Sequence, residues 1–136
     1  MLFRSGSTEF VYGIENVIAA RSVNVGCVRM AERHQLTSPL SESSRTAAIA
    51  DIDAAIAEAA AEVPITKARS VIAVAGTATT VAAAALGLET YDRYAIHLAR
   101  ISAEKAHEIA QSLAAMTRSE IAALGFMHPE IGRAHV

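Results

Sequence analysis

The chain has 136 residues, enough for one domain, and 52% of them are apolar, with few aromatic residues. Its formal net charge of −2 at neutral pH provides no basic surface of the kind that binds nucleic acid. No apolar run approaches the roughly 20 residues that span a bilayer, and the lone Cys27 excludes an internal disulfide and favours a reducing compartment. We therefore expect a cytoplasmic α/β or α-helical protein that binds neither nucleic acid nor membrane.

A β-hairpin is the first predicted element. Residues 8–14 alternate, with Phe10 and Tyr12 on one face, as in a half-buried strand. Residues 13–16 have turn chemistry, and residues 17–25 predict the second strand.

Two helices are predicted next. The first is short, over residues 26–35. The second covers residues 45–63, where apolar residues recur at helical spacing, with Pro64 as its stop and a serine of the preceding loop (Ser41, Ser43 or Ser44) as its N-cap. We interpret the acidic residues on its other side as a solvated face rather than a metal site: Asp51, Asp53, Glu58 and Glu62.

Residues 70–87 predict a buried strand, a tight turn and a helix. Val71 to Val74 is a short β-branched apolar run, which suits a strand covered on both faces. Gly76 allows a sharp bend, and Gly87 predicts the helix stop. The unpaired N–H groups at the start of such a helix are a natural anion site; alternatively, Thr77 merely caps a core helix.

The last predicted elements are a strand over residues 95–101, a helix capped by Ser102, and a shorter helix that is capped by Thr117 and runs through 124. Glu120 stands at the capping-box position of that shorter helix. His128 lies in a loop with no second ligand at metal spacing, so we interpret it as structural.

Two short motifs carry the functional prediction. Gly6-Ser7-Thr8-Glu9 is a Gly and hydroxyl loop that carries a carboxylate into the first strand, and Ala75-Gly76-Thr77-Ala78-Thr79-Thr80 opens the helix described above. In this order they resemble the Ppx/GppA family of exopolyphosphatases and guanosine-pentaphosphate phosphohydrolases, in which Asp-Ile-Gly-Gly-Gly-Ser-Thr-Glu and Gly-Gly-Thr-Ala-Thr-Thr recur. Gly26-Cys27-Val28-Arg29-Met30 is similar to the family's Gly-x-Val-Arg-Leu-Thr-Glu segment.

The resemblance implies an α/β, ribonuclease H-like half-domain of the actin, Hsp70 and sugar-kinase superfamily, with a mixed sheet that lacks most of its first strand. It assigns residues 6–129 to part of the second domain of such a phosphatase, with the missing first domain as partner. Residues 1–5 and 130–136 match translated sequencing adapter, so we expect non-native ends. We also expect poor stability, or a hairpin and a 71–74 strand left apart or repaired by residues 1–4.

The resemblance also implies an activity: hydrolysis of a terminal phosphoanhydride of inorganic polyphosphate or guanosine pentaphosphate, with Mg²⁺. Glu9 would hold the Mg²⁺ or orient the attacking water; the alternative is a solvent-facing strand residue. The chain alone is expected to be inactive, since the facing catalytic glutamate and the motif's aspartate are absent. The phosphate-binding residues would be Gly6, Ser7, Thr8, Gly76, Thr77, Thr79 and Thr80.

Two other functions stay open at this point. One is an ATP-binding domain of a sugar or acetate kinase, and the other is a non-catalytic nucleotide-binding module of the actin or Hsp70 type. The sequence does not choose between polyphosphate and guanosine pentaphosphate, and it leaves open a homodimer of the full-length protein.

Overall fold

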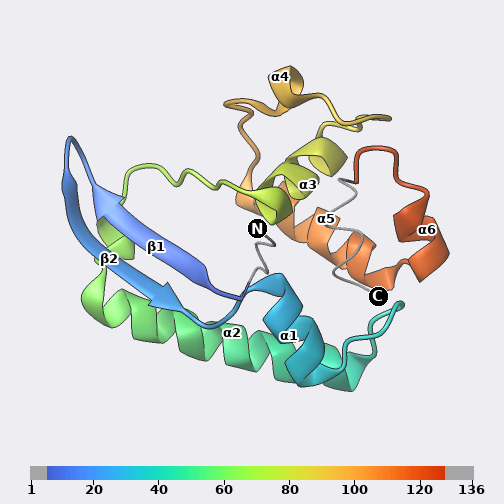
Figure 1. Cartoon of the computed structure of the whole chain (residues 1–136). Helices are drawn as coiled ribbons and strands as arrows, with labels where there is room; N and C mark the ends of the chain where they lie inside the picture. The colour runs from blue at the N-terminus through green and yellow to red at the C-terminus, as the bar shows by residue number, and fades with distance from the viewer. Residues whose placement is uncertain (1–5, 128–136) are drawn as a thin grey trace. The chain divides into compact units, whose positions relative to one another are not determined.

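The computed structural model describes residues 6–127, which form two compact units (Figure 1). Unit 1 contains residues 6–36 and 41–72, and unit 2 contains residues 37–40 and 73–127. Within residues 6–127, no helix combines the length and the apolar character that crossing a membrane requires.

The predicted hairpin is confirmed in unit 1. β1 (Thr8–Gly13) pairs antiparallel with β2 (Val17–Val23), so each strand ends one or two residues earlier than predicted. Phe10 and Tyr12 are half-buried, whereas Val11 is 62% exposed, which confirms the face assignment.

Both predicted helices of unit 1 are also confirmed. α1 covers Cys27–His34, and α2 covers Glu42–Glu62, beginning three residues before its predicted start. Ser41 is the N-cap of α2, because its Oγ accepts a hydrogen bond from the backbone N–H of Ser44 at 3.2 Å. The helix ends two residues before Pro64, as expected for a residue that cannot continue it.

The core of unit 1 forms where the hairpin packs on α2. Val23, Ala55 and Ala59 are 3%, 8% and 0% exposed, and Phe10 and Val25 pack against them. Because the helix contributes alanines here, it adds little side-chain bulk between its backbone and the sheet. Figure 1 shows the hairpin lying along the length of α2. A turn of 3₁₀ helix, η1 (Ile65–Lys67), follows α2.

The predicted strand at Val71–Val74 is wrong for this chain. The segment belongs to no helix or strand, and Val71, Ile72 and Val74 are 88%, 81% and 78% exposed. A strand buried on both faces needs neighbours for its N–H and C=O groups, and the only sheet of the described residues is the β1–β2 pair. This agrees with the expectation that the hairpin and the segment would be left apart; any repair by residues 1–4 lies outside the described residues.

The first helix of unit 2 is α3 (Gly76–Ala85), which ends two residues before the predicted stop at Gly87. Gly87 has a φ of 65°, in the left-handed region that favours glycine. Its N–H donates to Ala84 O at 3.1 Å, and the N–H of Leu88 donates to Ala83 O at 3.1 Å. These two bonds form a Schellman motif, which satisfies carbonyls that the helix leaves unpaired.

The predicted strand at residues 95–101 is wrong. The chain instead forms a single helical turn, α4 (Arg93–Ile96), followed by irregular backbone. The side chain of Asp92 accepts hydrogen bonds from the N–H groups of Tyr94 and Ala95 at 2.9 and 3.1 Å. This N-cap favours a helical turn over an extended strand. The strand prediction rested on the apolar residues alone and did not take the cap into account.

The last two helices confirm their predicted caps. Ser102 caps α5 (Ala103–Ala115) by accepting from the N–H of Lys105 at 3.1 Å. In α6 (Arg118–Ala122), which ends two residues before the predicted 124, Thr117 and Glu120 bond reciprocally in a complete capping box.

We expect the 136-residue chain alone to unfold in a broad thermal transition. A two-stranded sheet with an unpaired apolar segment contributes little to a net stability that is typically only about 5–15 kcal/mol. Circular dichroism and calorimetry measure this directly. A single sharp transition, with equal calorimetric and van't Hoff enthalpies, would contradict the expectation.

Candidate functional site

The Glu9 carboxylate lies among hydroxyl groups at the start of the hairpin. Its Oε1 accepts hydrogen bonds from Ser7 Oγ at 2.6 Å and from Ser22 Oγ at 3.1 Å. Ser22 stands opposite Glu9 in the strand register, so the hairpin itself brings the second hydroxyl to the carboxylate. These bonds lower the pKa of Glu9, the one from Ser7 most and the one from Ser22 next. The carboxylate is therefore exposed, ionised and held in place.

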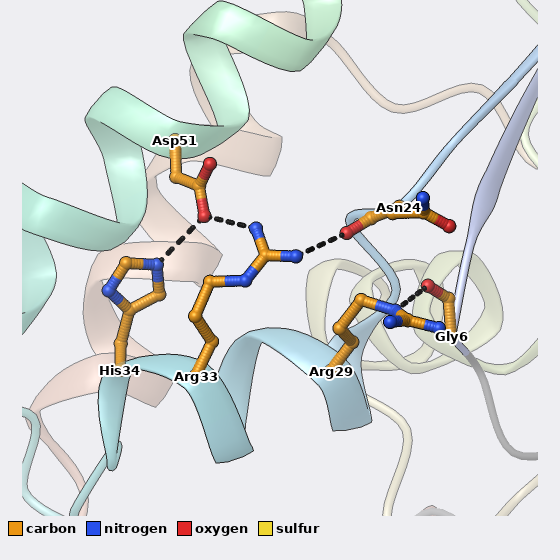
Figure 2. Close-up of polar contacts among 6 residues, drawn as sticks. All are labelled: Gly6, Asn24, Arg29, Arg33, His34 and Asp51. Carbon is orange, nitrogen blue, oxygen red and sulfur yellow. Dashed lines mark hydrogen bonds and ion pairs between the residues drawn. The ribbon is translucent and has the colours of Figure 1, made fainter.

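The residues before Glu9 are hydrogen-bonded to α1 and to the turn that precedes it. Arg29 Nε donates to the carbonyl oxygen of Gly6 at 2.8 Å, as Figure 2 shows. Thr8 Oγ1 donates to the carbonyl oxygen of Val25 at 3.2 Å. The hydroxyl proton of Thr8 is thus bonded to the Val25 carbonyl, and Thr8 Oγ1 can still accept a hydrogen bond. The phosphate-binding role assigned to Gly6, Ser7 and Thr8 stays a prediction.

Arg33, Asp51 and His34 form a second polar cluster of unit 1, which anchors α1 to α2 (Figure 2). Asp51 Oδ2 accepts from Arg33 Nη1 and lies 3.0 Å from His34 Nε2, while Arg33 Nη2 donates to Asn24 O at 3.3 Å. The Arg33 guanidinium, then His34, lowers the pKa of Asp51. Because α1 also carries Arg29, this cluster helps to position the Gly6 loop.

Among the other acidic residues of α2, two form ion pairs with the hairpin and one is exposed. Arg21 pairs with Glu58 and with Glu62, the latter at 3.1 Å, and Asp53 is exposed. Within residues 6–127, no group of three or more His, Cys, Asp or Glu side chains could hold a metal ion. The face predicted as solvated is therefore partly ion-paired, a feature that helix periodicity alone did not reveal.

In unit 2, the first turn of α3 leaves backbone donors unused by the helix. The first bond of the helix runs from the N–H of Thr79 to the carbonyl oxygen of Ala75, at 3.1 Å. The N–H groups of Gly76, Thr77 and Ala78 come before this bond, and no side chain caps the helix. The alternative in which Thr77 caps a core helix is therefore wrong. Such N–H groups, together with the helix dipole, favour an anion.

The three threonines of this turn differ in exposure. Thr77 is exposed, Thr79 is half-buried with its Oγ1 donating to Gly76 O at 3.0 Å, and Thr80 is only 8% exposed. Thr77 is thus the hydroxyl most accessible to a ligand. The phosphate-binding roles of Gly76, Thr77, Thr79 and Thr80 stay predictions, and so does a site shared with the Gly6 loop, which belongs to the other unit.

Comparison with known proteins shows which proteins the chain is similar to. A crystal structure of an exopolyphosphatase-like protein matches it with a TM-score of 0.89 and 37% identity, over 96% of this chain and 43% of that one. Exopolyphosphatase 2 of Mycobacterium tuberculosis, in the CDC 1551 / Oshkosh and H37Rv strains alike, is 40% identical over 131 residues. This similarity covers 96% of the chain and 40% of the relative, so the chain spans about two-fifths of that protein.

The chain belongs to the Ppx/GppA phosphatase family, whose model matches residues 5–136. The family resemblance and the α/β class predicted from the sequence are thereby confirmed. The matched range includes residues 130–136, which the adapter hypothesis treats as foreign. Those residues and His128 lie outside the described residues, so both interpretations stay predictions.

We expect Ser7→Ala to raise the pKa of Glu9 towards its usual value, and Ser22→Ala to raise it less. Each substitution removes a hydrogen bond that favours the ionised carboxylate, and the bond from Ser7 has the larger effect. Because the pKa of Glu9 is lowered, the stabilisation from these bonds is present at neutral pH and is lost as the pH falls through that pKa. NMR titration of the Glu9 carboxyl carbon measures the shift. An unchanged titration in Ser7→Ala would refute this geometry.

Proposed function

We propose that the protein to which this chain belongs is an exopolyphosphatase, which hydrolyses the terminal phosphoanhydride bond of inorganic polyphosphate or of guanosine pentaphosphate. Family membership and the 40% identity to Exopolyphosphatase 2 support this proposal. The observation that carries it is the Glu9 carboxylate, held ionised by Ser7 and Ser22 beside a glycine loop. The activity is ascribed to the whole protein, since the chain spans 40% of that relative.

In this proposal each of the two loops binds phosphate groups. Gly6, Ser7 and Thr8 provide one loop, and the residues from Gly76 to Thr80 provide the other. The unused N–H groups at the start of α3 support the second assignment. Phosphoryl transfer requires positioning and charge neutralisation more than covalent participation, and backbone donors and hydroxyls supply both.

The properties of Glu9 favour orienting the water or holding a metal over abstracting a proton. A carboxylate with a lowered pKa stays ionised at neutral pH, and it is then a weak base but a good acceptor and ligand. Mg²⁺ is commonly held by one or two carboxylates together with substrate phosphates. Glu9 fits that donor set as a single protein ligand, and a bound Mg²⁺ would neutralise charge on the phosphates.

The test compares two glutamates of the hairpin in the full-length protein. Glu9→Gln removes the negative charge, and we expect phosphate release from polyphosphate of defined length to fall about 100-fold or more. Glu15→Gln, at an exposed position of the turn between β1 and β2, is the matched control and should stay within about twofold of the parent protein.

Two results would contradict the proposal. Glu9→Gln with activity close to that of Glu15→Gln would remove Glu9 from the reaction. Phosphate release by the 136-residue chain alone would show that the facing domain is not needed. Parallel assays with guanosine pentaphosphate decide which of the two substrates the protein prefers.

A further inference from the structure

The side chain of Arg29 reaches from α1 to the backbone of Gly6. Its Nε donates to the Gly6 carbonyl oxygen at 2.8 Å, between residues that are 23 positions apart in the sequence (Figure 2). Within residues 6–127, this carbonyl is the only hydrogen-bond partner of the Arg29 side chain. Arg21 and Arg33, by contrast, both pair with carboxylates of α2. The contact with Gly6 is therefore what distinguishes Arg29 from the arginines that connect the hairpin and α1 to α2.

The hydrogen bond from Arg29 fixes the direction of the Gly6–Ser7 peptide. This peptide is trans, so its C=O and its N–H point in opposite directions. Because the carbonyl points to Arg29, the N–H of Ser7 points away from the guanidinium. Rotation of the peptide would break the hydrogen bond, so the bond favours this one orientation of the N–H.

The N–H of Ser7 is an open donor in the part of the chain that the structure describes. The β1–β2 pairing begins one residue later, at Thr8, and no loop hydrogen bond engages the Ser7 N–H. Gly6 and Ser7 are both half-buried. A partly buried N–H without an acceptor costs free energy, so an acceptor supplied by a ligand would be favoured there.

Contacts on both sides hold this arrangement in place. Ser7 Oγ donates to Glu9 Oε1 at 2.6 Å, so the residue with the open N–H also holds the carboxylate. On α1, Arg33 lies four residues after Arg29, on the same face of the helix, and pairs with Asp51 of α2. The peptide therefore lies between a fixed carboxylate and an anchored helix.

We propose that Arg29 is a positioning residue of the loop formed by Gly6, Ser7 and Thr8. It holds the Gly6–Ser7 peptide in the orientation in which the Ser7 N–H donates to a phosphate oxygen. The inference rests on the proposed function, which assigns phosphate binding to this loop, and it adds the residue that orients the donor. Arg29 acts through the peptide and not by touching the phosphate.

The test uses two substitutions of similar length, which separate the hydrogen bond from the charge. Gln carries its amide nitrogen on Cδ, as Arg carries Nε, so Arg29→Gln keeps a donor at that point and loses the charge. Arg29→Met has a methyl group there and loses both. We expect Arg29→Met to weaken binding of inorganic tripolyphosphate to the full-length protein about tenfold or more, as for a lost hydrogen bond to a charged group. Arg29→Gln should stay within about threefold of the parent, since an exposed charge contributes little.

The NMR signal of the Ser7 amide is the readout that is specific to positioning. Hydrogen bonds of one peptide polarise each other, so this signal responds both to the Arg29 bond and to a bound phosphate. Isotopic labelling of glycine carbonyl carbons and serine nitrogens selects Gly–Ser peptides, and loss of the signal in Ser7→Ala assigns it. We expect tripolyphosphate to shift the signal in the parent and in Arg29→Gln. In Arg29→Met the signal should move from its parent position and no longer respond.

Arg118 provides the matched control. It is exposed, as Arg29 is, and it lies in α6 of unit 2, away from the Gly6 backbone that Arg29 holds. Arg118→Met removes the same side chain and one positive charge, and it should bind tripolyphosphate as the parent does. Circular dichroism melting curves confirm that each variant is folded.

The outcomes separate this inference from the proposed function. Equal losses in Arg29→Gln and Arg29→Met, a weakened Arg29→Met with an unmoved Ser7 signal, or binding in Arg29→Met equal to that in Arg118→Met would each overturn the positioning role. A parent protein that releases phosphate from polyphosphate, but whose Ser7 signal ignores tripolyphosphate, would overturn the inference alone. A parent protein that shows the Ser7 response and releases no phosphate would overturn the proposed function alone.

Discussion

The antiparallel register of β1 and β2 is the constraint on which the first loop depends. Because Glu9 faces Ser22 across the hairpin, one strand brings a hydroxyl to the carboxylate of the other. A shift of one residue would move every side chain of β1 to the opposite face and break that contact. The core favours the observed register, since it buries Val23 and packs Phe10 against α2. Packing of the hairpin on α2 thus favours the register that places the Ser22 hydroxyl beside the Glu9 carboxylate.

The arginines of α1 extend that constraint to the glycine loop. Arg29 holds the Gly6 carbonyl, while Arg33 connects Asn24 to Asp51 of α2. These contacts are exposed or partly exposed, so each adds little to global stability. Their effect is positional: they set where the loop lies relative to the helix that carries them. In unit 2 the backbone itself sets where the Gly76 turn lies, since Ala75 adopts a φ of 74° at the start of α3.

Local signals in the sequence predicted most of the helices and their ends. Serine and threonine caps, the stop at Gly87 and the alternation of Phe10 and Tyr12 depend on neighbours only a few residues away, so they can be read from one chain. The Val71–Val74 strand could not be predicted in the same way, because a strand exists only through its partners. At residues 95–101 the apolar pattern predicted a strand, whereas the Asp92 cap favours the helical turn that forms there. The contact of Ser22 with Glu9 could not be predicted either, because it depends on the register of the hairpin.

The uncovered segment from Val71 to Val74 has a consequence for how this polypeptide behaves in concentrated solution. It belongs to no helix or strand, carries no charge and is rich in β-branched residues, with three large apolar side chains that are 78–88% exposed. Such a run, lacking proline and charge, matches the composition of peptides that stack into cross-β fibrils. Lys67 and Arg69 just before it act as charged gatekeepers on one flank, and the other flank, at Ala75 and Gly76, has none.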